Sequence, residues 1–219
     1  MSVVSYDNSF GGFSSGVGDY TFSYTNAGNY LMVNTYATVS AVTYNGVSMS
    51  VLQTYTPTGI PFGANCPPIR VWGLSNPYIG TANIVVTGGG LLDTAVISLK
   101  GVGEVTQPSY SNTNDTHGGQ TGTLSSSATV SKNGSWIVAF IRGGNNLPRT
   151  WVATSGSTLR QGGSASILVD ACGIADLNTA ENTGTYSCGF DWASGSGFST
   201  MITMAISPQP PFTGSMQII

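Results

Sequence analysis

Residues 42–55 read VTYNGVSMSVLQTY, and this stretch decides the fold class of the chain. Both ends of it are rich in Val, Thr and Tyr, residue types that suit a pleated strand. Asn45-Gly46 separates them and is the strongest short-range hairpin signal, because both residues tolerate the positive φ of a tight turn. We therefore predict an antiparallel hairpin between strands at 42–44 and 48–55.

Similar short runs recur about every 10 to 15 residues, each bounded by Gly, Asn or Pro, as in sandwiches and barrels. Lys, Glu and Ala, which favour helices, are scarce. The sequence therefore predicts an all-β chain, an antiparallel two-sheet sandwich that is jelly-roll-like and has about a dozen strands. The further strands are expected at 20–25, 30–39, 69–74, 81–87, 95–101, 123–131, 136–142, 164–170, 185–192 and 199–207.

Two of these strands have continuous rather than alternating apolar residues, at 84–86 and 136–141. Continuous apolar runs suit strands that are covered on both faces. We therefore expect both segments to be central in the sandwich or to lie under a loop or a neighbouring subunit.

The length of 219 residues fits one large sandwich or two small domains. Neither half alone is expected to close a pair of sheets, so we predict one sandwich domain over residues 1–207. Residues 105–122 are polar and poor in strand signals, which indicates an exposed loop, a crossover or a domain boundary. Residues 208–219 contain three prolines and are predicted to form a C-terminal arm. Its candidate subunit contacts are Phe212, Met216, Ile218 and Ile219.

Charged residues make up only 7% of the chain, against roughly 25% in ordinary soluble proteins. Six basic residues and a net charge of −3 provide no basic patch for nucleic acid. No apolar run is long enough to span a membrane, and residues 1–7 lack the features of a signal peptide. We expect a surface like that of an extracellular protein on a chain made in the host cytoplasm, which fits a virion protein.

The three cysteines, Cys66, Cys172 and Cys188, cannot all pair within one chain. A bridge between Cys172 and Cys188 is one interpretation. Buried free thiols are the interpretation that we favour, because a chain of this size does not need a disulfide to fold.

Residues for chemistry are few. His117 is the single histidine, it lies in a polar loop beside Asp115, and no nucleophile with a base is evident. We expect no enzyme, no cofactor and no metal site, although an aspartate pair acting on glycosidic bonds stays an alternative. A second alternative is a calcium loop formed by Asp170, Asp176, Asn178, Glu181 and Asn182.

Most of the tryptophans are expected in the core, because Trp buries a large area and three of the four lie in predicted strands. Trp151 is the best candidate for an exposed ring that stacks on a sugar. It follows a loop in which Asn145 and Asn146 provide amides for sugar hydroxyls.

Three segments, VTYNGVSM (42–49), VWGLSNPYIGTANIVVT (71–87) and AVISLKGV (95–102), share a pattern of turns and strands. Over about residues 40–105 this pattern resembles a large family of β-sandwich proteins found in phage and bacterial surface sequences. The resemblance implies a jelly-roll-like sandwich in a surface or virion context. It implies no catalytic residues.

Two functions follow as hypotheses. The first is a virion structural protein, such as a capsid decoration, vertex or fibre subunit, that contacts copies of itself and a capsid or other virion protein. The second is a carbohydrate-binding module that recognises a surface glycan, as the receptor-binding part of a phage fibre or on a cell surface.

Overall fold

A computed structural model describes residues 2–13, 18–56, 68–88, 93–105, 109–115, 122–143, 151–162, 171–192 and 197–210. The described residues form strands and connections, with no helix among them. The strands of the first half are β1 (Ser5–Phe13), β2 (Tyr20–Asn26), β3 (Tyr30–Tyr36), β4 (Ala41–Tyr44), β5 (Val47–Ser48), β6 (Ser50–Tyr55), β7 (Ile69–Ser75), β8 (Gly80–Thr87) and β9 (Asp93–Lys100).

The second half continues directly after Gly101 with a further set of antiparallel strands. They are β10 (Val102–Val105), β11 (Ser109–Asp115), β12 (Gly122–Val130), β13 (Trp136–Gly143), β14 (Trp151–Ala153), β15 (Thr158–Gln161), β16 (Ala171–Asp176), β17 (Gly184–Trp192) and β18 (Gly197–Pro208).

Each half builds its own pair of sheets. Sheet A has the order β1-β9-β3-β7-β6 and sheet B the order β2-β8-β4-β5. Sheet C has the order β10-β18-β13-β16-β15, with β11 also paired to β18, and sheet D the order β12-β17-β14. The strand pairs are nested: β1 with β9, β2 with β8 and β3 with β7, then β11 with β18, β12 with β17 and β13 with β16. Nested pairing in two facing sheets is the jelly-roll arrangement, and this chain contains it twice.

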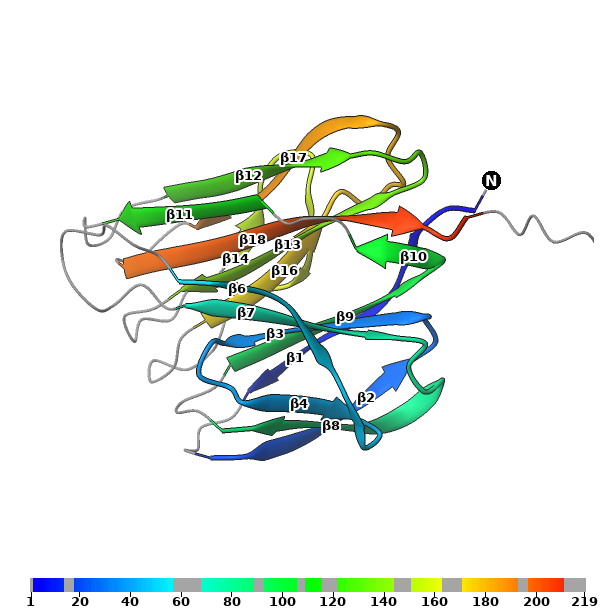
Figure 1. Cartoon of the computed structure of the whole chain (residues 1–219). Coiled ribbons are helices and arrows are strands. Elements are labelled where there is room, and N and C mark those ends of the chain that lie inside the picture. The colour runs from blue at the N-terminus through cyan, green and yellow to red at the C-terminus, as the bar shows by residue number, and fades with distance from the viewer. Residues whose placement is uncertain are drawn as a thin grey trace, which may run out of the picture.

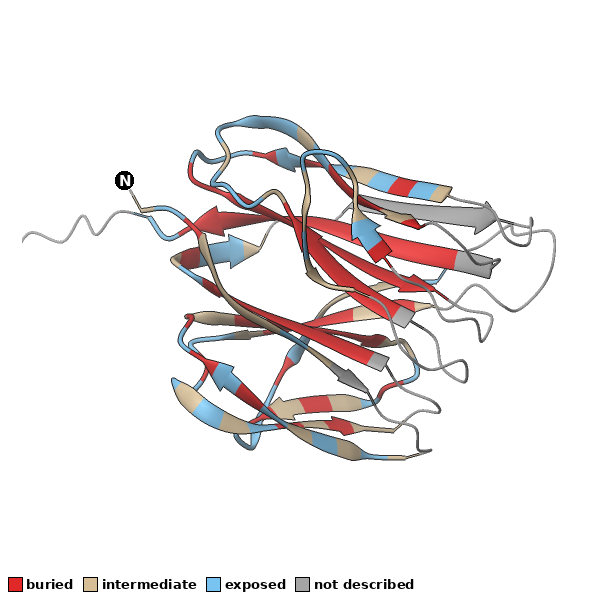
Figure 2. Ribbon diagram, turned by 180° about the vertical axis from the view of Figure 1, so that it is seen from behind, coloured by how far each residue is buried: buried red, intermediate tan, exposed pale blue. Residues whose placement is uncertain are grey.

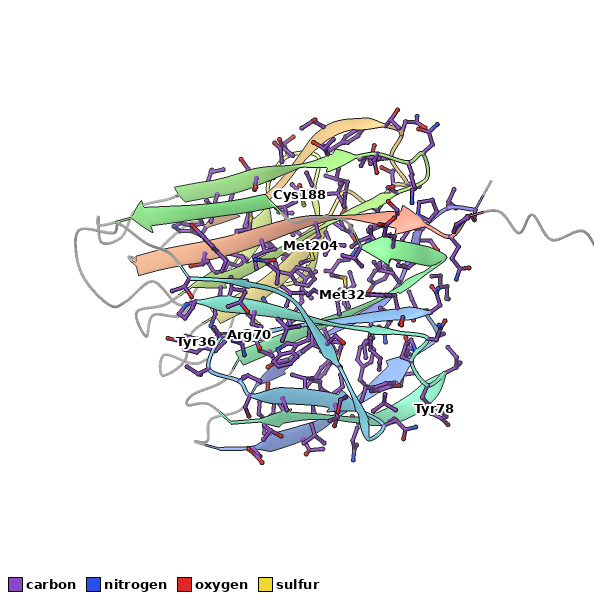
Figure 3. All side chains as sticks on the ribbon, in the orientation of Figure 1. Met32, Tyr36, Arg70, Tyr78, Cys188 and Met204 are labelled. Atoms are coloured by element: carbon purple, nitrogen blue, oxygen red, sulfur yellow. The ribbon has the colours of Figure 1, made fainter. Side chains whose placement is uncertain are left out.

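The four sheets lie in layers in the order B, A, C, D (Figure 1). One apolar cluster fills each of the three spaces between layers. The central cluster joins sheet A to sheet C, and Met32 and Met204 face each other within it (Figure 3). Burial is therefore concentrated in the two middle sheets, whereas the outer sheets alternate between buried and exposed residues (Figure 2).

The all-β, antiparallel and jelly-roll-like prediction is confirmed. The described strands form four sheets where we expected two, and the two halves share no sheet. Our expectation that neither half alone closes a pair of sheets is wrong. The physical reason is that several strands lack a strong apolar pattern, among them β1, with the sequence SYDNSFGGF, and β15, with the sequence TLRQ.

Polar contacts also connect the two halves. Asn29, in the β2–β3 turn, exchanges two hydrogen bonds with the backbone of Val102, at 2.8 and 3.0 Å. Asn34 on β3 donates a hydrogen bond to the carbonyl oxygen of Ile141 on β13 at 3.2 Å. The guanidinium of Arg160 lies 3.9 Å from the centre of the Tyr6 ring. The apolar layer and these contacts hold the two jelly rolls together as one stack.

The predicted hairpin is confirmed on β4 and β5, with φ of 50° at Asn45 and 76° at Gly46. Its second strand is shorter than expected, because the chain leaves sheet B at Met49 and joins sheet A as β6. The continuous run at 136–141 is buried on both faces, as predicted, since β13 lies between the central and the second-half clusters.

The polar segment 105–122 is not simply a loop, because β11 occupies part of it and pairs with β18. The division between the two pairs of sheets falls earlier, at Gly101, where φ is 74°. The strand expected at 164–170 and most of the arm expected at 208–219 lie outside the described residues.

Cys172 and Cys188 are buried and no disulfide joins them, so the bridge between them is excluded. Their side chains lie in different apolar layers, one on each face of sheet C. Burial raises the pKa of the Cys188 thiol to about 11, which keeps it protonated at neutral pH. Cys66 lies outside the described residues.

Candidate functional site

An open groove of about 660 Å³ lies on the outer face of sheet B. It is formed by two strands of that sheet, the β4–β5 turn and the β7–β8 loop. The lining residues are Thr43, Asn45, Gly46, Tyr78, Thr81, Ala82, Asn83 and Val85.

The alternation of β8 forms the floor of the groove. Ile84 and Val86 point inward and are fully buried, whereas Asn83 and Val85 face the groove. Val85 is only partly buried, so the chain itself does not cover residues 84–86 on both faces as a central strand would be covered. Cover of this face by a neighbouring subunit stays a prediction. Sheet B is an outer layer, and among the described residues no further sheet lies over this face (Figure 1).

The Asn45-Gly46 turn forms one side of the groove. The backbone N–H of Asn45 donates a hydrogen bond to the carbonyl oxygen of Asn83 at 3.0 Å, which fixes the turn against β8. Both asparagine side chains are exposed. Each amide carries hydrogen-bond donors and an acceptor, so the pair can bind hydroxyl groups in either direction.

Tyr78 stands at one end of the groove, in the loop between β7 and β8 (Figure 3). Its side chain is 52% exposed, and the neighbouring Ile79 is 59% exposed. An exposed large aromatic side chain in a concave surface is the usual anchor of a ligand site.

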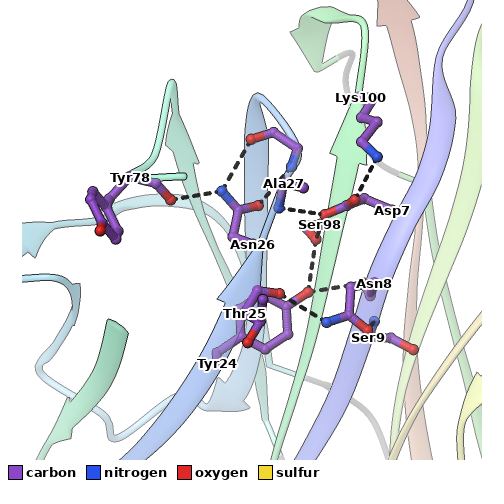
Figure 4. Close-up of polar contacts among 11 residues, drawn as sticks. Asp7, Asn8, Ser9, Tyr24, Thr25, Asn26, Ala27, Tyr78, Ser98 and Lys100 are labelled. Carbon is purple, nitrogen blue, oxygen red and sulfur yellow. Dashed lines mark hydrogen bonds and ion pairs between the residues drawn. The ribbon is translucent and has the colours of Figure 1, made fainter. Parts of the chain in front are cut away.

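Buried polar groups hold the backbone of this loop in place. The Asn26 amide, which is fully buried, donates a hydrogen bond to the Tyr78 carbonyl oxygen at 2.9 Å (Figure 4). The Tyr44 hydroxyl donates to the Gly80 carbonyl oxygen at 2.8 Å, and the Asn76 N–H donates to the Asn29 carbonyl oxygen at 2.8 Å. The exposed ring is therefore presented by a loop that is fixed at three points.

Gly80 leaves the space that the Tyr78 ring occupies. A Cβ atom at this position would lie 2.9 Å from Cε1 of the ring, and the φ of Gly80 is 130°, a region that other residues avoid. An alanine here would both strain the backbone and displace the ring.

The groove carries no charge on its lining side chains, which are hydroxyl, amide, aromatic and aliphatic. Beneath it, burial raises the pKa of Tyr44, and the proximity of Tyr78 adds to the effect. The Tyr44 hydroxyl thus stays protonated and remains a donor to the loop.

Asp7 supports the turn next to Asn26. Its carboxylate accepts hydrogen bonds from the Ala27 N–H at 2.8 Å and the Ser98 hydroxyl at 2.7 Å, and it pairs with Lys100 at 2.8 Å (Figure 4). Burial alone would raise the pKa of Asp7, but the bonds from Lys100, Ala27 and Ser98 outweigh it and hold the pKa below its ordinary value of 3.8.

A pH-dependent stability follows from this depressed pKa. The contribution of Asp7 is present above its unfolded pKa and is lost as pH falls through the lower folded value. We expect Asp7→Asn to destabilise the protein by about 1 kcal/mol at neutral pH, a small value because Lys100 is half exposed. The difference from the parent, measured by urea unfolding, should narrow well below pH 3.8. If the stability difference between Asp7→Asn and the parent were the same at neutral pH and well below pH 3.8, this role of Asp7 would be contradicted.

The β16–β17 loop of the second jelly roll corresponds to the β7–β8 loop that carries Tyr78, and the two can be compared. Asn76 is the first residue after β7 and Asn178 is the second after β16, and both have positive φ, of 50° and 59°. The loop that follows Asn178 reads TAENTG and contains no aromatic residue. The left-handed asparagine belongs to the fold, whereas an exposed Tyr78 is particular to the first half.

An exposed ring was predicted from the sequence at Trp151, and the structure shows this ring to be buried. Trp151 is 1% exposed and packs edge-to-face against Phe190 and Trp192, so the expected exposure is wrong. The other tryptophans are buried too, as predicted. Asn145, Asn146 and His117 lie outside the described residues, as do Phe212, Met216, Ile218 and Ile219.

Asp176 and Glu181, two of the residues considered for calcium, accept hydrogen bonds from other groups of the chain. The carboxylate of Asp176 is fully buried and accepts bonds from Arg160, from Trp136 and from the Asn178 N–H. Glu181 accepts a hydrogen bond from the Thr179 hydroxyl, and Asp170 lies outside the described residues. Within the described ranges, no group of three or more His, Cys, Asp or Glu side chains is arranged to hold a metal ion.

The sequence did contain a signal for Tyr78 that our reasoning did not use. The segment NPYIG places an aromatic residue inside an Asn-Pro turn, between two strands. Turns lie at the surface, so a large ring within one is a candidate contact residue.

Comparison of the chain with protein-family models, with curated proteins and with solved structures finds no match. The resemblance to phage and surface sandwiches therefore stays a prediction. No helix in the described part of the chain is long and apolar enough to cross a membrane.

Proposed function

We propose that the chain is a non-enzymatic binding protein that recognises carbohydrate in the groove on sheet B. The observation that carries the proposal is the Tyr78 ring, which is 52% exposed although its loop is fixed by buried hydrogen bonds. The predicted carbohydrate role is thus kept, with its site at Tyr78 instead of Trp151.

The chemistry of the lining supports a sugar ligand. An aromatic face can stack on the C–H face of a sugar ring, and the amides of Asn45 and Asn83 can bind the hydroxyl groups around it. Because the loop and the turn are already held in place, little conformational freedom is lost when a ligand binds.

The direct test is binding of Tyr78→Ala to a glycan array, followed by titration calorimetry on the best ligand. We expect affinity to fall about thirtyfold, since truncating a central aromatic anchor costs about 2 kcal/mol of binding free energy. The fold should survive, because the hydrogen bond from Asn26 goes to the backbone of Tyr78 and not to its ring.

Two variants serve as controls. Ile79→Ala removes an equally exposed neighbour that does not line the groove, and it should bind like the parent. Tyr78→Phe keeps the ring and should retain most of the affinity. Equal glycan binding by Tyr78→Ala and the parent would refute the proposed site.

A structural role in a virion is a second proposal, and exposed apolar side chains favour it. Val47 and Val51 are 54% and 48% exposed and flank Met49, where the chain passes from sheet B to sheet A. Burying such side chains against another protein is favourable, and the occupant we propose is a second copy of the chain, together with a capsid or other virion protein. Jelly rolls occur in capsid and in lectin domains, which is an analogy at the level of fold only.

Light scattering of the purified chain tests this second proposal. A concentration-independent symmetric oligomer that Val47→Ser with Val51→Ser disrupts would support it. A monomer at all concentrations would count against assembly through this surface and would leave the glycan proposal untouched.

A further inference from the structure

The shape of the groove indicates what kind of glycan it takes, an inference that rests on the proposed function. Thr81, Asn83 and Val85 alternate along β8 and face the same side, so they span roughly 13 Å in a row. Tyr78 lines the same groove from the loop that leads into the strand, two residues before Gly80. The groove is therefore elongated along β8 and is longer than one sugar ring.

The groove is also open to solvent on the outer face of sheet B. A closed pocket would enclose a terminal sugar and would leave no space for further sugar units on both of its sides. An open groove instead admits sugars from the middle of a chain, with neighbouring units extending past the lining residues.

The polarity of the lining selects against charged sugars. None of the lining residues is a cation that could pair with a carboxylate or a sulfate. The nearest arginine and lysine side chains in sequence to these strands have other partners: Arg70 binds the Val39 carbonyl oxygen and the Thr54 hydroxyl, and Lys100 pairs with Asp7. Removing an anionic group from water without a partner is unfavourable.

We infer that the groove binds an uncharged polysaccharide chain lengthwise along β8. One sugar unit stacks on Tyr78, and the following units lie over Thr81, Asn83 and Val85. The amides of Asn45 and Asn83 bind the hydroxyl groups of these units from the side and from the floor of the groove.

The experiment uses the whole chain and an array of neutral and acidic glycans of graded length. The neutral probes are malto-, cello- and manno-oligosaccharides from monosaccharide to hexasaccharide, and the acidic probes are oligogalacturonates, oligomannuronates and sialylated glycans. We expect a neutral series to bind, with affinity rising at least tenfold from monosaccharide to tetrasaccharide, and no acidic probe to bind.

A charge variant sharpens the test. Asn83→Lys places a cation on the groove floor and should create binding to the polyuronates at low salt. Thr185→Lys places the same charge on an exposed position of sheet D and should not. Asn45→Gly deletes an amide without straining the turn, because Gly accepts the φ of 50°, and it should weaken neutral binding.

The outcomes separate the two levels of the proposal. Two results would overturn the inference of a neutral polysaccharide: Tyr78-dependent binding to acidic glycans, or a monosaccharide that binds as tightly as a tetrasaccharide. Either result would still support carbohydrate binding at this groove. An array without any Tyr78-dependent signal would overturn both.

Discussion

Replacing Arg160 with alanine should destabilise the folded protein by about 3 to 5 kcal/mol, because it leaves a carboxylate buried without its cation. Arg160 Nε lies 2.7 Å from Asp176, whose side chain is fully buried, and only 14% of the arginine side chain is exposed. Without Arg160, the charge of Asp176 would retain the Trp136 indole N–H at 3.1 Å and the Asn178 N–H at 2.9 Å. Two neutral donors do not replace a buried cation.

The measurement is urea unfolding of the single variants and of a double variant, Arg160→Met with Asp176→Asn. The double variant removes the buried charge together with its partner, so it should lose less than the sum of the single changes. Lys132→Ala breaks the exposed pair with Glu104 and should change stability little. A loss for Arg160→Ala as small as that of Lys132→Ala would contradict the role given to the buried pair.

Replacing Phe140 with alanine should cost about 3 to 5 kcal/mol, the usual range for removing a buried aromatic ring. Phe140 is fully buried on β13 and belongs to the central cluster, which joins the two jelly rolls. Because both halves contribute to this cluster, we expect the substitution to lower the free energy of unfolding of both, as in a single cooperative unit.

Hydrogen exchange measured by mass spectrometry tests this coupling. Strand β3 belongs to the first jelly roll and β13 to the second. In Phe140→Ala, the free energy of opening of the most protected amides should fall by the same amount in β3 as in β13. Phe140→Leu keeps much of the volume and should show a smaller loss in both halves. Unchanged protection in β3 would mean that the halves unfold separately, and the prediction of one domain over residues 1–207 would then be wrong.

Local features of the fold could be predicted from the sequence because each depends on a few adjacent residues. Asn45-Gly46 specified its turn, and the continuous apolar run of β13 specified a strand covered on both faces. That the chain contains two jelly rolls was not predicted from the sequence. This duplication is visible only in how the strands pair, because the corresponding strands of the two halves share few residue types. Their shared marks are backbone conformations, such as the positive φ of Asn76 and Asn178.

The candidate site that we propose has the residue types that were expected from the sequence, at another place in the chain. An exposed aromatic residue with flanking amides was expected, yet the sequence around Trp151 suggested the wrong ring. Exposure depends on tertiary neighbours, and Trp151 is covered by Phe190 and Trp192 on the adjacent strand β17, about 40 residues away in the sequence. Tyr78 stays uncovered because sheet B is the outermost layer on its side.

Because the chain contains two jelly rolls, the segment that carries Tyr78 could be transferred from the first to the second. The β16–β17 loop of the second jelly roll has the same left-handed start as the loop of Tyr78, so it is a natural acceptor for that segment. Sheets B and D form opposite outer layers of the stack, and a second groove on sheet D would point away from the first (Figure 1). If the groove binds polysaccharide as we propose, such a chain with two grooves would crosslink separate polymers into a network. It would gain little avidity on a single flat surface, because both grooves cannot reach that surface together.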